Sequence, residues 1–148
     1  MNQTVPQALS ILMLRSRIPK PFSLTVSGVS MLPVLHAGDI ISVCRKDTYE
    51  IGDILVFLYK NNDLLVHRLL KIEKDRYFCK GDNSFRLEDI SSNQIIGAVQ
   101  LEYDPHRTAE FVNDSFRINR IFRDNKYDIS TTKQDPEYHR YHKKYLEA

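Results

Sequence analysis

Between Phe22 and Tyr103 the sequence is a succession of short apolar segments separated by turns. Each segment has the length of a strand, and several of the turns contain a Gly-Asp pair. The run at 53–59 is almost continuously apolar, which predicts a central strand buried on both faces. Strands at this spacing favour a mainly β fold, a small, curved, barrel-like domain. The segments expected to form strands are 23–27, 39–45, 53–59, 64–72, 76–80 and 95–102.

The segment before these strands has a helical pattern. Residues 6–18 predict a short amphipathic helix, because Leu9, Leu12 and Met13 fall on one face at helical spacing. We expect this helix to pack on the core of its own domain. The alternative is an apolar surface that binds a membrane or a partner.

The segment after the strands changes character again at Pro105. Residues 107–124 carry a helix-like apolar stripe. Residues 126–148 are polar, and their tyrosines are spaced so that a terminal helix can follow Pro136. A solvated helix or a frayed tail is the expected state of this end. The predicted organisation is therefore an N-terminal helix and linker over 1–21, a β core over 22–104 and a C-terminal helical extension or tail over 105–148.

Composition narrows the class of protein. A chain of 148 residues is long enough for one domain with a real core. The net charge of +2 argues against a dedicated nucleic-acid-binding protein, although residues 1–38 contain three basic and no acidic residues. The two cysteines, Cys44 and Cys79, lie in strand-like segments and are expected to be buried free thiols rather than a disulfide framework. No segment has the ~20 apolar residues that cross a bilayer.

Three short motifs carry the chemistry. Ser30 lies in the run Ser27-Gly28-Val29-Ser30-Met31-Leu32-Pro33, His67 lies in the predicted strand 64–72, and the turn Gly81-Asp82-Asn83 comes later. A serine hydroxyl is a weak nucleophile without an adjacent base, and a neutral imidazole is suited to that role near neutral pH. The motifs thus predict a serine peptidase. They include no ligand cluster with metal spacing, so neither a metal nor an organic cofactor is expected.

The order of the sequence blocks is more specific than any single motif. After the serine motif come Ala37-Gly38-Asp39, Gly52-Asp53-Ile54-Leu55-Val56-Phe57, Val66-His67-Arg68, Lys80-Gly81-Asp82-Asn83 and Ile96-Gly97-Ala98-Val99. This succession, over residues 22–102, resembles the type I signal peptidases and the related self-cleaving SOS and phage repressors. The resemblance implies that Ser30 is the nucleophile. His67 stands where bacterial signal peptidases and the repressors usually carry Lys, so the chain resembles the Ser-His variety of the endoplasmic reticulum and archaea.

A third catalytic member should orient the histidine, and three acids are candidates. In the Ser-His relatives an acid about six residues beyond the Gly-Asp pair usually has this role. That position holds Glu88, and Asp89 comes next. We expect Asp89, brought into register by a one-residue insertion, slightly ahead of Asp82, which can instead brace its turn. By resemblance, the backbone N–H of Ser30 stabilises the oxyanion, and Gly28 stands where some relatives have an additional hydroxyl.

The chain departs from both kinds of relative. It shows neither the spanning helix of the signal peptidases nor the DNA-binding domain of the repressors ahead of Phe22. We therefore expect a cytoplasmic serine endopeptidase that cleaves a peptide or leader segment, with peripheral membrane contact through residues 6–18 as an open variant. Its partner would be a peptide or protein bound as an extended strand, with small residues before the cut by resemblance. The alternatives are a catalytically silent peptide-binding member of the same fold and a repressor-like regulator that cuts itself.

Overall fold

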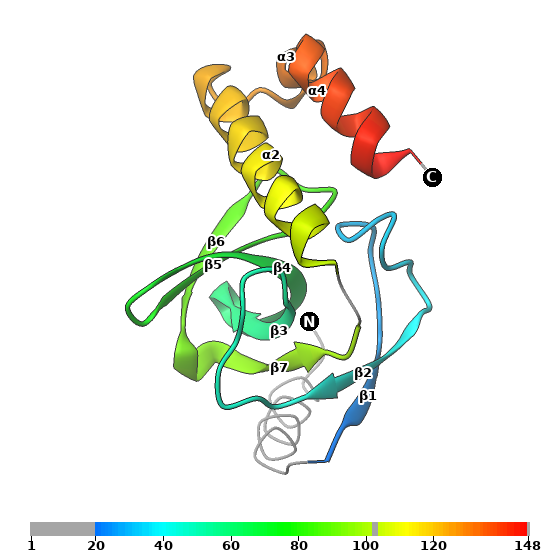
Figure 1. Cartoon of the computed structure of the whole chain (residues 1–148), viewed down its shortest axis with the longest axis vertical. Coiled ribbons are helices and arrows are strands. Elements are labelled where there is room, and N and C mark those ends of the chain that lie inside the picture. The colour runs from blue at the N-terminus through cyan, green and yellow to red at the C-terminus, as the bar shows by residue number, and fades with distance from the viewer. Residues whose placement is uncertain (1–19, 102–103, 148) are drawn as a thin grey trace.

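The computed structural model describes residues 20–101 and 104–147 (Figure 1). They form one curled antiparallel sheet with helices at its C-terminal end, so the mainly β prediction is confirmed. The predicted helix at 6–18 lies outside the described residues. The seven strands follow the order β1-β2-β7-β3-β4-β5-β6. Their bounds are β1 Phe22–Thr25, β2 Ile40–Cys44, β3 Ile54–Tyr59, β4 Asp63–Glu73, β5 Arg76–Lys80, β6 Leu87–Ser91 and β7 Ile95–Val99.

Strand β3 is the middle strand of the sheet, as its continuous apolar run predicts. Ile54 and Val56 join one core cluster, with residues of β2 and β7. Leu55 and Phe57 point to the other face and join a second cluster, with residues of β4 to β7. A strand covered on both faces needs no polar alternation, which is why this segment was the clearest strand in the sequence.

Strand β7, the last in the chain, is inserted between β2 and β3. Val43 pairs with Val99, and Leu55 pairs with Ala98, so β7 joins two parts of the sheet that do not pair directly. Gly97 is required by this close fit. A Cβ there would lie 2.9 Å from both the Cys44 carbonyl oxygen and Val43 Cγ1.

Strand β6 was not predicted from the sequence. Its segment, Leu-Glu-Asp-Ile-Ser, places two acids in the middle and does not alternate like a half-buried strand. In the structure Glu88 and Ile90 both face inward and Asp89 is exposed. The inward position that would normally be apolar is therefore occupied by a carboxylate, and this hid the strand.

Helices follow the sheet: α2 spans Pro105–Asp124, α3 Ile129–Lys133 and α4 Pro136–Tyr141, with one more turn to Leu146. The helix expected over 107–124 is confirmed. Each of these three helices begins at an Asp whose side chain accepts a backbone N–H, a strong start signal. The expectation of a solvated or frayed C-terminal end was wrong. Tyr138 and Tyr141 are buried against α2, where they form a third core cluster.

The described cysteines and helices bear on two further predictions. Cys44 and Cys79 are free thiols, and Cys79 is buried whereas Cys44 is half-buried. Burial raises the pKa of the Cys79 thiol, so it stays protonated. Among the described residues, no helix has the length and apolar character needed to cross a membrane.

The helices are joined to the sheet through a bulge in β4. The β4–β5 register shifts between Leu69 and Lys71, and the extra residue, Leu70, packs into the third core cluster. Leu69 on the other face belongs to the second cluster. The bulge therefore lets neighbouring side chains of one strand pack into two separate core clusters.

We predict that Leu70→Ala lowers the free energy of unfolding by about 2–4 kcal/mol, because it leaves a cavity between the sheet and the helices. Ile72→Ala is the matched control, since Ile72 lies on the same strand and is 37% exposed. Its loss should be about 1 kcal/mol or less. Urea denaturation followed by circular dichroism measures both, and equal losses would contradict the two-core role of β4.

Candidate active site

Ser30 is presented by the loop between β1 and β2, which rises from the sheet toward the C-terminal helices (Figure 1). The loop turns at Gly28, whose φ of +77° is a conformation that favours glycine. Three residues later, Met31 anchors the loop, because its side chain is 2% exposed and packs into the first core cluster. Ser30 itself is half-buried, between the turn and the anchor.

His67 meets this serine from β4. It pairs with Leu55 of β3, so its side chain points to the same face as the second core cluster, and its ring lies at the edge of Phe57 with centroids 6.2 Å apart. His67 is 3% exposed. Its Nε2 lies 2.9 Å from Ser30 Oγ, within hydrogen-bond distance. The structure thus brings together the two residues that the sequence selected as nucleophile and base.

Glu88 of β6 completes a line of hydrogen bonds. Its Oε1 contacts Nδ1 of His67, and its side chain is fully buried. A carboxylate only accepts hydrogen bonds, so Nδ1 carries the proton and Nε2 is left to accept from the Ser30 hydroxyl. The other oxygen, Oε2, accepts from Arg86 Nε at 3.0 Å. Both oxygens of this buried acid are therefore held by hydrogen bonds.

The expectation that Asp89 orients the histidine is corrected by the strand geometry. Successive residues of a strand point to opposite faces, so Asp89 points away from His67 when Glu88 points toward it. Asp89 is exposed and its Oδ1 accepts from Arg76 Nε at 2.8 Å. The β5–β6 pairing is continuous, with Glu88 opposite Cys79 and Asp89 opposite Phe78, so Asp89 stays on the outward side of β6.

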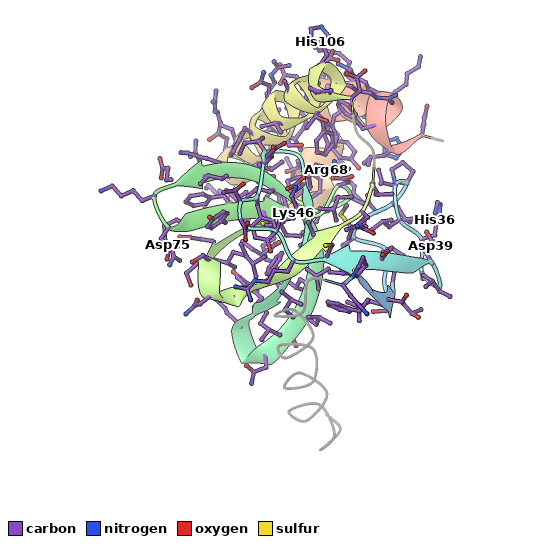
Figure 2. The ribbon with its side chains drawn as sticks, turned by 60° about the horizontal axis from the view of Figure 1, so that its bottom comes forward. His36, Asp39, Lys46, Arg68, Asp75 and His106 are labelled. Atoms are coloured by element: carbon purple, nitrogen blue, oxygen red, sulfur yellow. The ribbon has the colours of Figure 1, made fainter. Side chains whose placement is uncertain are left out.

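Asp82, the other acid expected at the site, has a different partner. Arg68 Nε and Nη2 donate to its two carboxylate oxygens, each at 2.9 Å, and Nη1 donates to the Gly52 carbonyl at 3.0 Å. The guanidinium also lies 5.2 Å from the centre of the Phe111 ring, between the sheet and α2 (Figure 2). Asp82 therefore braces its turn, which was the second role considered for it.

The turn at Gly81 holds the serine loop in place. The Asn83 N–H donates to the Ser30 carbonyl at 2.8 Å, and the Asn83 side chain donates to the Val29 carbonyl at 3.2 Å. A Cβ at Gly81 would lie 2.6 Å from the Ser30 carbonyl oxygen and 3.1 Å from His67 Nε2. Only glycine lets the turn approach both residues, so the Gly-Asp pair is part of the site itself.

A backbone N–H beside the nucleophile can serve as a donor for an oxyanion. The Ser30 N–H, the group that resemblance assigns to this task, donates to no other described group. A carbonyl attacked by Ser30 Oγ would find this N–H on the same residue. Gly28 contributes no side-chain hydroxyl.

Lys80 lies next to the site and was not singled out from the sequence. It is 1% exposed, and its Nζ donates to the Gly81 carbonyl at 3.1 Å and to the Tyr141 hydroxyl at 3.2 Å. The Tyr141 hydroxyl donates in turn to the Asp82 carbonyl at 3.2 Å. Burial lowers the pKa of Lys80 to about 8, against the opposing effect of Asp82 and Glu88. The sequence showed a Lys-Gly-Asp block, but nothing in it showed that this lysine meets a helix 61 residues later.

Arg86, which holds the outer oxygen of Glu88, was also missed. Its side chain is 57% exposed, and no periodicity distinguishes it from other surface arginines. Glu88 was among the three candidate acids, because it stands at the spacing from the Gly-Asp pair that the Ser-His relatives use, but it was ranked behind Asp89.

We predict that Lys80 contributes an increase of stability with pH between about pH 8 and pH 10, opposite in sign to the contribution of the Cys79 thiol with its raised pKa. The folded pKa of Lys80, about 8, lies below the ~10.4 of an unfolded lysine, so the unfolded chain binds more protons in this range. Lys80→Met should remove this part of the increase. Lys71→Met is the matched control, since Lys71 is an exposed lysine on β4 and its loss should leave the pH dependence unchanged. Denaturant unfolding across the pH range tests this, and identical pH profiles for the Lys80→Met and parent proteins would contradict it.

Comparison with known proteins identifies the family of this chain. A search of curated proteins gives no match. A family model described as Peptidase S24-like matches residues 3–100 of the 148, a range that includes Ser30, His67 and Glu88. The chain therefore belongs to the Peptidase S24-like family and, at that level, is a hydrolase of the serine peptidase type.

Proposed function

We propose that this protein is a serine endopeptidase of the Ser-His variety that cleaves a peptide or leader segment. Ser30 is the nucleophile, His67 the general base and Glu88 the acid that orients it. The observation that carries the proposal is the continuous line of hydrogen bonds from Glu88 Oε1 through both nitrogens of His67 to Ser30 Oγ.

The reaction follows from this line. As Ser30 Oγ attacks the carbonyl carbon of the peptide, its proton passes to Nε2 of His67, and the carbonyl oxygen becomes an oxyanion near the Ser30 N–H. When the C–N bond breaks, His67 returns the proton to the leaving amine and an acyl-serine remains. A water molecule, deprotonated by the same imidazole, then releases the acyl group and restores the serine.

Burial gives Glu88 its part in the reaction. The imidazolium formed during attack would be a buried positive charge, which is costly without a partner. The fully buried carboxylate of Glu88 supplies that partner at Nδ1, and the bond from Arg86 stops it from rotating away. The family repressors' usual lysine base would present no second nitrogen for such an acid to hold.

The sheet also offers a place for an extended substrate. Strand β1 is at one end of the sheet, and within residues 20–101 and 104–147 it pairs only with β2. It runs directly into the loop that carries Ser30, five residues after Thr25. A peptide added to the outer edge of β1 would therefore be led toward the nucleophile.

The proposal is tested with the intact protein and its Ser30→Ala variant, each incubated with a pool of peptides and analysed by mass spectrometry. We expect defined cleavage products with the parent protein and none with Ser30→Ala. Ser27→Ala, in the same motif but exposed, is the matched control and should cleave like the parent. Products formed equally by Ser30→Ala would refute the role of Ser30. Peptides retained but never cut by the parent would favour the catalytically silent alternative.

The identity of the acid is tested by two neighbouring substitutions. Glu88→Gln should lower kcat by about 10²–10⁴-fold, because an amide can donate to Nδ1 and thereby favour the wrong tautomer of His67. Asp89→Asn should change kcat by less than about twofold, because Asp89 is exposed and bonded to Arg76. Steady-state kinetics on one cleaved peptide measures both. The opposite ranking would return the role to Asp89.

A further inference from the structure

The C-terminal helices lie beyond the residues that the family model matches, which end at residue 100, yet they reach the candidate active site. They form one side of a cavity of about 550 Å³ whose other side is the Ser30 loop and the turn that follows Gly81. Ser30 itself lines the cavity. Whatever enters the cavity therefore lies beside the nucleophile.

The helical side of this cavity is largely apolar. It is lined by Phe122 of α2, Ile129 of α3, Tyr138 of α4 and Leu146 of the last turn, and Phe85 lies on the sheet side. Two apolar residues at the site are unusually exposed, Ile129 at 52% and Val29, next to Ser30, at 60%. Exposed apolar side chains gathered around a hollow mark a surface that binds an apolar group.

The helical wall is held firmly to the catalytic turn. Phe85 stacks on Phe122 with ring centroids 5.1 Å apart and contacts Tyr138 at 5.6 Å. The Tyr141 hydroxyl donates to the Asp82 carbonyl, one residue from the glycine that touches Ser30 and His67. The wall and the nucleophile are thus positioned by the same turn, so the cavity is preformed rather than made by the ligand.

We propose that this cavity binds a bulky apolar side chain of the substrate, next to the peptide bond that is cut, so that the helical extension sets the cleavage specificity. The inference rests on the proposed endopeptidase function. A volume of about 550 Å³ lies within the usual range for ligand pockets and is more than a methyl group needs. Of the charged residues at the lining, Arg86 and Lys133 are exposed, and the buried carboxylate of Asp82 is already paired with Arg68. The interior therefore favours leucine, methionine or an aromatic residue over a charged one. This differs from the small residues that the resemblance to signal peptidases led us to expect.

The test separates binding from cleavage. The Ser30→Ala protein is equilibrated with a library of random peptides, and the retained peptides are sequenced by mass spectrometry. We expect enrichment of bulky apolar residues of about tenfold or more over alanine and glycine at one position. Ile129→Trp, which fills the mouth, and Ile129→Asp, which places a charge there, should each abolish this enrichment in the same background. Ile40→Trp is the matched control, because Ile40 is 76% exposed on β2 and does not line the cavity.

The parent protein is then given the same library, and the cut sites are read. Cuts beside bulky apolar residues that shift to smaller ones with Ile129→Trp would support the proposal. Ser30-dependent cuts flanked only by small residues, or an enrichment that Ile129→Trp and Ile129→Asp leave intact, would overturn it while leaving the peptidase function standing. Enrichment without any cleavage would support the cavity as an apolar binding site and refute the peptidase function instead.

Discussion

The contact between His67 and Glu88 is the constraint on which the arrangement of the site depends. A histidine and a carboxylate that are both buried require each other, because either one alone would leave a polar group unsatisfied in the core. They come from β4 and β6, which both pair with β5. The two pairings of β5 together determine which side chains of β4 and β6 meet. A slip of one residue in β6 would turn Glu88 to solvent and Asp89 to the interior. The ladder therefore sets which carboxylate faces the histidine.

A second constraint joins the serine loop and helix α4 at the turn around Gly81. This turn receives the serine loop on one side, through the Asn83 N–H, and helix α4 on the other, through the Tyr141 hydroxyl. Lys80 lies beneath it and donates to both the turn and Tyr141. The buried amine of Lys80 donates to one acceptor in the turn around Gly81 and to another in helix α4. The lysine therefore links the position of the helices to that of the turn.

The sequence predicted the elements whose residue pattern matches their burial, and failed where the pattern and the burial differ. Strand β3 was clear because a strand that is buried on both faces has a continuous run of apolar residues. Ser30 and His67 were clear because their blocks occur in a recognisable order. Strand β6 was missed because an inward-facing Glu88 breaks the apolar pattern that reveals a strand. Without the strand, the side on which each acid lies could not be assigned, so Asp89 was ranked ahead of Glu88. The burial of Tyr138 and Tyr141 was missed because their partners on α2 and near Gly81 are distant in sequence.

The insertion of β7 between β2 and β3 has a consequence for the order in which the molecule can be built. Ser30 lies in the β1–β2 unit, whereas His67 and Glu88 lie in the β3–β6 unit, and the described strands of the two units do not pair with each other directly. During synthesis both units emerge before residues 95–99 do, and pairing across so long a separation carries the entropic cost of closing a large loop. The sheet therefore joins the strands that flank Ser30 to those that carry His67 and Glu88 only when its last strand is in place.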